Sequence, residues 1–572
     1  MRVHGRILFP VLLLLVLGPG AVTLRAQASL VPAYHPVYEW LHHLRVRGIL
    51  PRFNYEALPL TRGGITALLD SAATRENRLS FADRALLASF RAEFVVDTTT
   101  PVVTLLQGGD STIGATLRQK VDLILSDRIP HLYRYTGTED NATVDYTAGL
   151  GWFAGSEVAG TVDKFEVKRL EAYGTLRQRI GFHVDLQDAS SSSLFRFHPQ
   201  WRSTAETEGG SSSTVWGQGF ATAALGAFQV DIGTGTQRVG APARQAVILQ
   251  PYSANFDWVR LSFNTRVVQY SFTHGSLVAD PYDTVLAGSG LPTRVAPARW
   301  IAVRRLQIRP DARLQLGFTE TLTYSNRGVD LAYLNPIYPL RFAEFNTNGR
   351  DDPVWYLDAV IRPVSGLEVS GTLGIDDMYS FADWLRPTGH RSNNDLTTKL
   401  LYQAWSTIAM APGTDVYGGY VRVEPFFYTH ILPLNTYEQW HLPLGAEVGP
   451  NGDEWTVGVR QWLPWRGSIA VSLSGGRHGL NPVDSLGNEI ADVGGSLTSR
   501  QTTQRVLFLA GDVHHTRTIR VDGEFEPFRG IRLEAHWEHR DVTLGTRLPQ
   551  YSVLRIQTSF MFYPFDVLLL PF

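Results

Sequence analysis

Three polar stretches of the chain combine aromatic side chains with carboxylates, amides and guanidinium groups. They cover residues 325–352, 376–396 and 428–454. Flat aromatic rings stack on the apolar faces of sugar rings, and carboxylates and amides hydrogen-bond hydroxyl groups. The stretches therefore predict contacts to a hydroxyl-rich ligand, although such aromatics are also typical of an interfacial girdle or of loops that pack together. The candidate residues are Tyr338, Arg350, Asp351, Asp352, Trp355, Tyr379, Trp384, Tyr428 and Trp440.

Residues for covalent or metal chemistry are few. The chain has no Cys, which excludes thiolate zinc sites, Cys nucleophiles and iron–sulfur clusters. Adjacent residues on a strand point to opposite faces, so His514 and His515 cannot share a metal. Asp351 and Asp352 could touch calcium, but two neighbouring carboxylates are more typical of a solvated pair. No nucleophile-elbow motif is present. The sequence therefore predicts no catalytic residue, no metal site, no cofactor and no enzymatic activity.

Composition indicates a large β-rich protein without a basic surface. The 572 residues carry a net charge of −2, with 19% charged and 44% hydrophobic residues. A net charge this small gives no positive electrostatic field that would attract nucleic acid, and the hydrophobic content is not that of a disordered chain. Abundant aromatics together with 52 Gly favour an all-β fold.

Alternation of polar and apolar residues runs along most of the chain from about residue 101. In "GLEVSGTLGID", Leu367, Val369 and Leu373 alternate with polar residues. In "EPFRGIRLEAHWEHR", residues 526–540, one face is apolar and the other is almost wholly ionisable. Period-two patterning of this kind predicts strands with one apolar and one polar face. The inward charged set would be Arg177, Arg179, Arg532, Glu534 and Glu538.

The connections between these segments alternate in length. Tight turns are predicted at Pro310, Pro363, Pro412, Pro464 and Pro527, and long stretches cover 325–352, 376–396, 428–454 and 477–504. Short periplasmic turns and long extracellular loops are typical of outer-membrane barrels, whose strands must close on themselves. We therefore predict an all-β transmembrane barrel of about 16–18 antiparallel strands with a small N-terminal helical bundle. A propeller or sandwich would not explain the alternation.

The N-terminal region predicts export and a helical unit. A basic start and the apolar run Ile7 to Leu17 precede a small-residue site at residues 26–28, so residues 1–28 are predicted to be a signal peptide. The alternative is a retained membrane anchor. Residues 29–100 have helical spacing, with Thr61 as an N-cap, and residues 101–572 form the barrel. Strand parity places the helical unit in the periplasm.

Two segments resemble the capsule-assembly Wzi-like family of outer-membrane proteins. They are "YHPVYEWLHHLRVRGILP…LPLTRGGITALL" near the N-terminus and "DLAYLNPIYPLRFAEFNTNGRDDPVWYLDAVIRP", residues 330–363. The resemblance covers essentially the mature chain and rests on short, partly apolar motifs. It implies an eighteen-stranded barrel with a periplasmic bundle that retains exported polysaccharide. The helical unit also looks distantly like a surface-layer homology module, which would bind wall polysaccharide.

We therefore predict a non-enzymatic, lectin-like outer-membrane barrel that attaches capsular polysaccharide or exopolysaccharide to the cell surface. The alternative is a porin or solute channel, and a lipid-modifying enzyme comes third. The expected partners are polysaccharide, outer-membrane lipid and lipopolysaccharide, and the barrel-assembly machinery. The protein is expected to be a monomer that does not bind nucleic acid.

Overall fold

The computed structural model describes most of the chain after residue 26. The described residues are 27–95, 102–104, 129, 131–155, 162–191, 206–208, 211–280, 282–285, 292–347, 349, 351–376, 399–410, 413–500, 506–544, 546–547 and 551–561. Three candidate residues, Arg350, Tyr379 and Trp384, lie outside them, as does nearly all of the predicted signal peptide. In the described part of the chain, no helix combines the length and the apolar character needed to cross a membrane.

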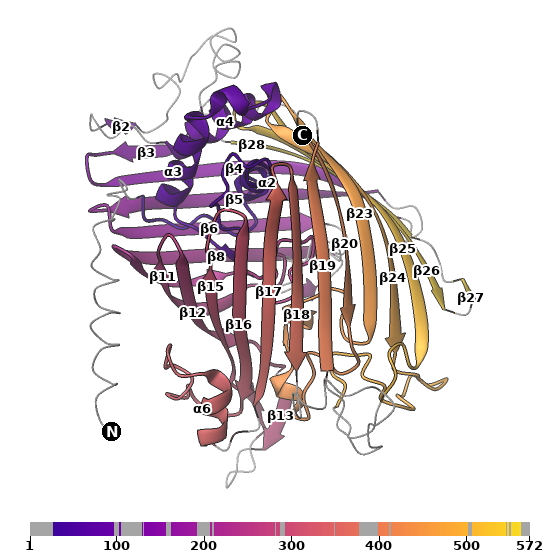
Figure 1. Cartoon of the computed structure of the whole chain (residues 1–572). Coiled ribbons are helices and arrows are strands. Elements are labelled where there is room, and N and C mark those ends of the chain that lie inside the picture. Colours follow the sequence, from indigo (N-terminus) through magenta and orange to yellow (C-terminus); the bar gives the residue numbers. More distant parts are fainter. Residues whose placement is uncertain are drawn as a thin grey trace, which may run out of the picture.

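A closed antiparallel barrel forms the body of the protein (Figure 1). Eighteen strands close it within the described residues, which confirms the predicted fold class. These strands are β4 (Asn141–Gly155), β5 (Val162–Leu176), β6 (Ile180–Ser191), β8 (Ser211–Leu225), β9 (Phe228–Gly235), β11 (Phe256–Asn264), β12 (Val268–Leu277), β15 (Arg299–Ile308), β16 (Leu314–Ser325), β17 (Asp352–Val364), β18 (Leu367–Asp376), β19 (Lys399–Ala409), β20 (Thr414–Val423), β23 (Gly452–Leu463), β24 (Gly467–Leu480), β25 (Asp512–Phe528), β26 (Ile531–Leu544) and β28 (Tyr551–Met561).

Shorter elements extend the barrel or lie at its ends. The short strands are β1 (Ala57–Leu58), β2 (Val102–Thr104), β3 (Tyr133–Thr136), β7 (Glu206–Glu208), β10 (Arg238–Val239), β13 (Tyr282–Val285), β14 (Pro292–Val295), β21 (Glu438–Gln439), β22 (Leu442–Pro443) and β27 (Thr546–Arg547). The helices are α2 (Val37–Val46), α3 (Arg62–Ala73), α4 (Phe81–Phe94) and α6 (Leu340–Thr347), with 3-10 turns η1 (Glu76–Arg78) and η4 (Pro433–Asn435).

Short and long connections alternate as predicted. The predicted turns at Pro310, Pro363, Pro464 and Pro527 join β15 to β16, β17 to β18, β23 to β24, and β25 to β26. Pro412, between β19 and β20, and residues 377–396 of the predicted long stretches lie outside the described residues. Pro363 and Pro527 lie within the last residues of β17 and β25, and the turns themselves follow one to three residues later. In the last of them Gly530 has φ +77°, a conformation that glycine adopts without steric cost. The four described turns lie at one end, called here the short-turn end, and the described long connections start from the opposite, long-loop end.

The wall has an apolar outer face and a polar inner face. On β24, Ile469, Val471 and Leu473 are exposed on the outside, whereas Ser472 and Ser474, which alternate with them, are buried. An apolar outer surface is the requirement for a barrel surrounded by lipid. The period-two pattern of the sequence thus reports the two faces of the wall.

The predicted inward charges divide into two groups. Glu538 accepts hydrogen bonds from Arg520 on the neighbouring β25, and Arg532 lies 3.9 Å from Glu534. Arg177 and Arg179 instead belong to the tight turn between β5 and β6, where Arg177 has φ +48° and is exposed. Placing those two arginines on an inward face was therefore wrong, because the chain reverses at that point.

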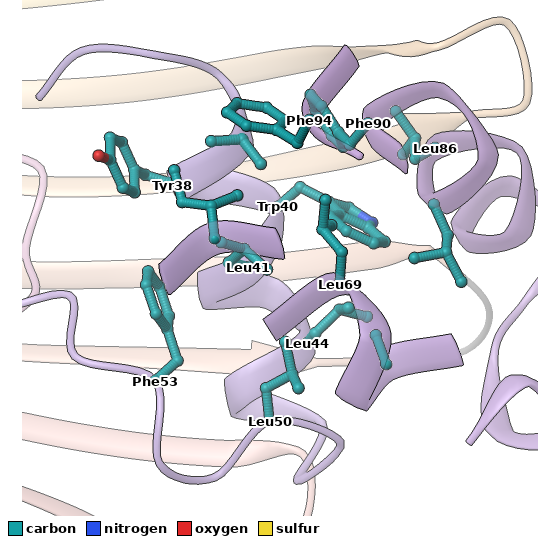
Figure 2. Close-up of a cluster of buried hydrophobic side chains, with 14 of the residues drawn as sticks. Tyr38, Trp40, Leu41, Leu44, Leu50, Phe53, Leu69, Leu86, Phe90 and Phe94 are labelled. Atoms are coloured by element: carbon teal, nitrogen blue, oxygen red, sulfur yellow. The ribbon is translucent and has the colours of Figure 1, made fainter. Parts of the chain in front are cut away.

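Helices α2, α3 and α4 form a compact bundle at the short-turn end. The Gly64 N–H donates to the Thr61 hydroxyl at 3.1 Å, which confirms the predicted N-cap, and Ser80 with Asp83 forms a capping box on α4. Figure 2 shows the shared core, in which Trp40 and Leu44 of α2 pack with side chains of the other two helices. Trp462 of β23 belongs to the same core, so the bundle and the barrel are packed together.

Buried ion pairs fix the bundle in the mouth of the barrel. The Arg45 guanidinium is fully buried and bridges Glu56 at 2.7 Å and Glu368 of β18 at 2.8 Å. His42 also hydrogen-bonds Glu368 at 2.7 Å. At the next contact, His43 meets Asp415 of β20 at 2.7 Å and Asp83 of α4 at 3.3 Å. Charges buried in this way are tolerated because each one has a partner.

Two long connections fold back from the long-loop end into the lumen. We call residues 236–255 and 424–451 the lumen plug. The Tyr428 hydroxyl donates to the Val247 carbonyl at 2.6 Å, and its ring stacks on Tyr437 at 5.4 Å. β10 of the plug pairs with β1 of the bundle, so segments from both ends of the barrel meet inside it. The side chain of Arg238 lies 4.3 Å over the Tyr55 ring at this junction.

Substitution of Arg45 tests the docking of the bundle. In Arg45→Ala, Glu56 and Glu368 lose a buried partner, and we expect a loss of about 3–5 kcal/mol in the free energy of unfolding of the bundle. Arg91→Ala removes a partly exposed pair with Asp70 and should cost less than about 1 kcal/mol. Denaturant titration of the helical circular dichroism in detergent measures both. Equal effects would contradict a docking role for Arg45.

The pH dependence of bundle stability follows from His43 and Asp83. Burial alone lowers the pKa of His43, but Asp415 and Asp83 outweigh burial and raise that pKa above 6.5. The stability that protonated His43 adds to the folded bundle is therefore complete below pH 6.5, and it is lost as the pH rises through the pKa of His43 in the folded protein. Burial alone raises the pKa of Asp83, but contacts with His43 and Ser80 lower it below 3.8. The stability that ionised Asp83 adds to the folded bundle is complete above pH 3.8, and it is lost as the pH falls through the lowered pKa of Asp83.

We therefore expect the backbone amides of α2 to be most protected from hydrogen exchange between about pH 4 and pH 6.5, with less protection at lower and at higher pH. Hydrogen exchange of α2 across this range measures it. His43→Gln keeps a polar side chain without the charge, so the decline on the alkaline side should disappear in that variant. An unchanged alkaline decline in His43→Gln would assign the effect to another group.

Candidate functional site

A two-residue hairpin turn presents Trp440 and His441 at the long-loop end. The turn joins β21 to β22, and both residues have positive φ, +52° and +59°. Such turns favour Asn-Gly, and a bulky residue in this conformation is held there only by its surroundings. Trp440 is nevertheless 42% exposed. The backbone thus keeps a large aromatic ring at the surface rather than letting it collapse into the loop.

Side chains from the neighbouring wall and loops hold this hairpin in place. The Arg299 guanidinium, at the start of β15, donates to the carbonyls of Leu434 and Thr436, each at 2.7 Å. The Gln439 amide donates to the Asn255 carbonyl at 2.8 Å and accepts from the Val278 N–H at 2.8 Å. A rigid support of this kind reduces the entropy that a loop loses when it binds a ligand.

The residue after Trp440 brings a polar pair to the same turn. The His441 Nε2 lies 3.1 Å from the Asp280 carboxylate, and both side chains remain largely exposed. An aromatic face next to an imidazole and a carboxylate can stack on a sugar ring and bind its hydroxyl groups. We call Trp440, His441 and Asp280 the Trp440 platform.

Below the platform, the lumen plug is densely packed. The Tyr437 hydroxyl donates to the Ile248 carbonyl at 2.7 Å, parallel to the bond from Tyr428 to Val247. A side chain at Gly445 would overlap the Tyr428 hydroxyl, so the close approach of these loops requires glycine there. Burial raises the pKa of Tyr428 well above its ordinary value, and the phenol stays neutral as a hydrogen-bond donor.

The structure separates the other candidate residues. Tyr428 is fully buried in the lumen plug, where a polymer outside the barrel does not touch it. Asp351 is buried too, and it accepts hydrogen bonds from Arg327 at 2.6 and 3.1 Å and from the Tyr333 hydroxyl. Asp352 is buried as the first residue of β17. These side chains stabilise loops, because their polar groups already have partners within the protein.

Two further candidates lie on the outside of the barrel, Trp355 on the wall and Tyr338 in the connection between β16 and β17. The Trp355 Nε1–H donates to Glu320 at 3.0 Å on that wall, and Tyr338 accepts a hydrogen bond from Asn346 at 3.0 Å. Trp440 is thus the most exposed of the described candidates, and it lies in a loop of the long-loop end. Asp280 and Arg299 were not among the candidates, because their roles depend on contacts distant in sequence. Among the described residues, no group of three or more His, Asp or Glu could hold a metal ion.

Comparison with known proteins gives similarity at the level of structure. No family model matches the sequence, and no curated protein matches it. The solved structure of Wzi, an outer-membrane protein involved in group 1 capsule assembly in Escherichia coli and described as a carbohydrate-binding β-barrel, superposes with a TM-score of 0.54. The match covers 93% of this chain and 99% of Wzi, at 12% identity.

More distant structural matches include OccAB2 of Acinetobacter baumannii, with a TM-score of 0.42, 12% identity, and coverage of 74% of this chain and 98% of that chain. OccK2 (OpdF) of Pseudomonas aeruginosa in complex with glucuronate matches with a TM-score of 0.41, 11% identity, and coverage of 73% and 96%. The expected resemblance to Wzi is thus confirmed for the fold, and the chain has the outer-membrane β-barrel architecture that Wzi also has.

Proposed function

We propose that this protein is a lectin-like barrel of the outer membrane that holds capsular or extracellular polysaccharide at the cell surface. The Trp440 platform is the observation that carries the proposal. An exposed aromatic ring, with a His and a carboxylate beside it, stands on a rigid support above a filled lumen. The similarity of fold to Wzi, described as carbohydrate-binding, supports the same function.

The orientation follows from the alternation of connections. Outer-membrane barrels place short turns in the periplasm and long loops outside the cell. In this orientation the bundle of α2, α3 and α4 faces the periplasm, and residues 1–28 serve as the signal peptide. The Trp440 platform then faces the extracellular medium, where polysaccharide is present. The protein acts as a monomer after insertion by the barrel-assembly machinery, among outer-membrane lipid and lipopolysaccharide, and has no enzymatic role.

Retention of a polymer does not require one tight site. A polysaccharide offers the same sugar unit many times, so weak contacts on neighbouring molecules add up to strong attachment. A single stacking platform per barrel is sufficient for this mechanism. The expected phenotype of a deletion strain is loss of cell-bound polysaccharide with normal release into the medium.

Substitution of Trp440 tests the platform. Trp440→Ala removes the ring, and we expect about a tenfold weaker affinity for polysaccharide, close to 1.4 kcal/mol. Trp455→Ala is the matched control, because Trp455 has the same 42% exposure but lies on the outer wall of β23. Glycan-array binding of the purified protein in detergent measures both variants. Equal losses, or no loss in Trp440→Ala, would contradict the platform.

A solute channel is the second candidate. On the inner face of β25 and β26, Asp522 and Arg532 keep side chains that are 52% and 42% exposed inside the wall. Charged, hydrated inner surfaces are typical of porins. The lumen plug and the bundle pair with each other inside the barrel through β1 and β10, which argues against a wide open path.

Planar-bilayer conductance separates the two functions. We expect the wild-type barrel to show no large, stable open channels, because the lumen plug and the bundle, which enter from opposite ends, meet in the lumen. A variant that lacks residues 241–247 removes the Val247 contact with Tyr428 and should conduct more than the wild type. Large stable channels in the wild-type protein would favour the channel function over the lectin.

A further inference from the structure

The connection between β16 and β17 lies on the outside of the barrel wall. We call its residues 326–347, which include α6, the outer arm (Figure 1). The side chains of β15 establish the face. Arg305 pairs with Asp358, and Gln307 donates to Asn54, which lies between α2 and β1, so the odd-numbered residues face the lumen. The even-numbered residues of β15, among them Arg304, therefore point outward.

The outer arm packs on this outward face. The Arg304 guanidinium donates to the Ile337 carbonyl at 3.1 Å, and the Leu340 N–H donates to Glu320 of β16 at 3.4 Å. Arg304 and Glu320 also form an ion pair with each other, and the Tyr270 hydroxyl donates to the Pro336 carbonyl. A buried apolar cluster completes the contact: Phe272, Ala302, Leu322, Tyr324, Tyr333, Leu340 and Ala343.

The positions of Arg304 and Glu320 within their strands show how deep in the membrane these contacts lie. Arg304 is the sixth of the ten residues of β15, and Glu320 is the seventh of the twelve residues of β16. The ion pair therefore lies about halfway along the wall, where the side chains of a transmembrane strand face hydrocarbon. A charged pair at that depth is unfavourable against lipid. Because the outer arm covers the pair and supplies polar backbone groups, the arm itself reaches into the same layer.

The side of the outer arm that faces away from the barrel is apolar. Ile337 is 86% exposed, although its carbonyl is bonded to Arg304, and Phe345 is 66% exposed. The other large exposed apolar side chains of the arm are Val329, Leu331, Leu334, Tyr338 and Phe342. So many large exposed apolar side chains within one short segment are unusual on a surface in water. The strands beneath it expose the apolar residues Leu306, Ile308, Leu316 and Leu357 on the same outer side of the wall.

We propose that the outer arm lies within the external leaflet of the membrane and that lipid acyl chains cover its apolar face. The arm continues the lipid-facing surface of the wall, so its partner is the hydrocarbon that the wall already contacts. Tyr338 then belongs to the lipid-facing surface rather than to a sugar site. The inference is independent of polysaccharide binding, and only the choice of the external leaflet rests on the orientation given under the proposed function.

Site-directed spin labelling tests the location of the outer arm. The chain has no Cys, so Ile337→Cys and Phe345→Cys each provide one labelling position. Leu357→Cys, on the outer face of β17, is the lipid control, and Leu486→Cys, 84% exposed in the loop between β24 and β25, is the water control. Each labelled full-length protein is placed in phosphatidylcholine vesicles, and its accessibility to oxygen and to a water-soluble nickel chelate is measured.

Oxygen concentrates in hydrocarbon and the chelate stays in water. We expect the oxygen-to-nickel ratio at 337 and 345 to match that at 357 and to exceed that at 486 by about fivefold or more. A ratio like that at 486 would place the arm in water and overturn the proposal. Shielding from both reagents, with spin–spin broadening between labels, would instead assign the face to a second copy of the chain. If one labelled variant fails to fold, the other decides the question.

Discussion

The whole structure depends on the hydrogen bonds that join the last strand to the first strand of the barrel. β28 pairs with β4 from Val553 opposite Gly155 to Met561 opposite Thr147, and β3 covers the earlier part of the same edge of β4. Unpaired backbone groups in lipid cost several kcal/mol each, so an open sheet would not persist there. Closure satisfies these groups, and it also confines every connection to one of the two ends.

Closure creates an interior that has to be filled or hydrated. The bundle enters from the short-turn end and brings its charges to meet those of the wall, as the pairing of Arg45 with Glu368 illustrates. The lumen plug enters from the long-loop end and satisfies its tyrosine hydroxyls on its own backbone. The Trp440 platform rests on this filled interior through Arg299, so wall, plug and platform form one mechanically continuous unit.

Features set by neighbouring residues were accessible from the sequence. Alternating faces, the turn near Pro464 and the N-cap at Thr61 depend on a few adjacent side chains, and all three were predicted. The turn after Leu176 was missed, because Arg177 and Gln178 adopt positive φ without any Gly or Pro to indicate it. Tyr428 lies in a loop that returns into the lumen, and the outer arm folds onto the opposite face of the wall. Periodicity describes strands and is silent on the path of a long loop, so the candidate site was predicted only in part.

The pairing of β1 with β10 constrains the order of assembly. β1 lies between α2 and α3, near the start of the chain, whereas β10 follows the fifth strand of the barrel. Both sit inside a ring that is sealed only when β28, close to the C-terminus, reaches β4. A sealed ring offers little space for a folded helical unit and two long loops to enter afterwards. The contents of the barrel must therefore be gathered while the sheet is still an open, curved structure, and the C-terminal strand then encloses them.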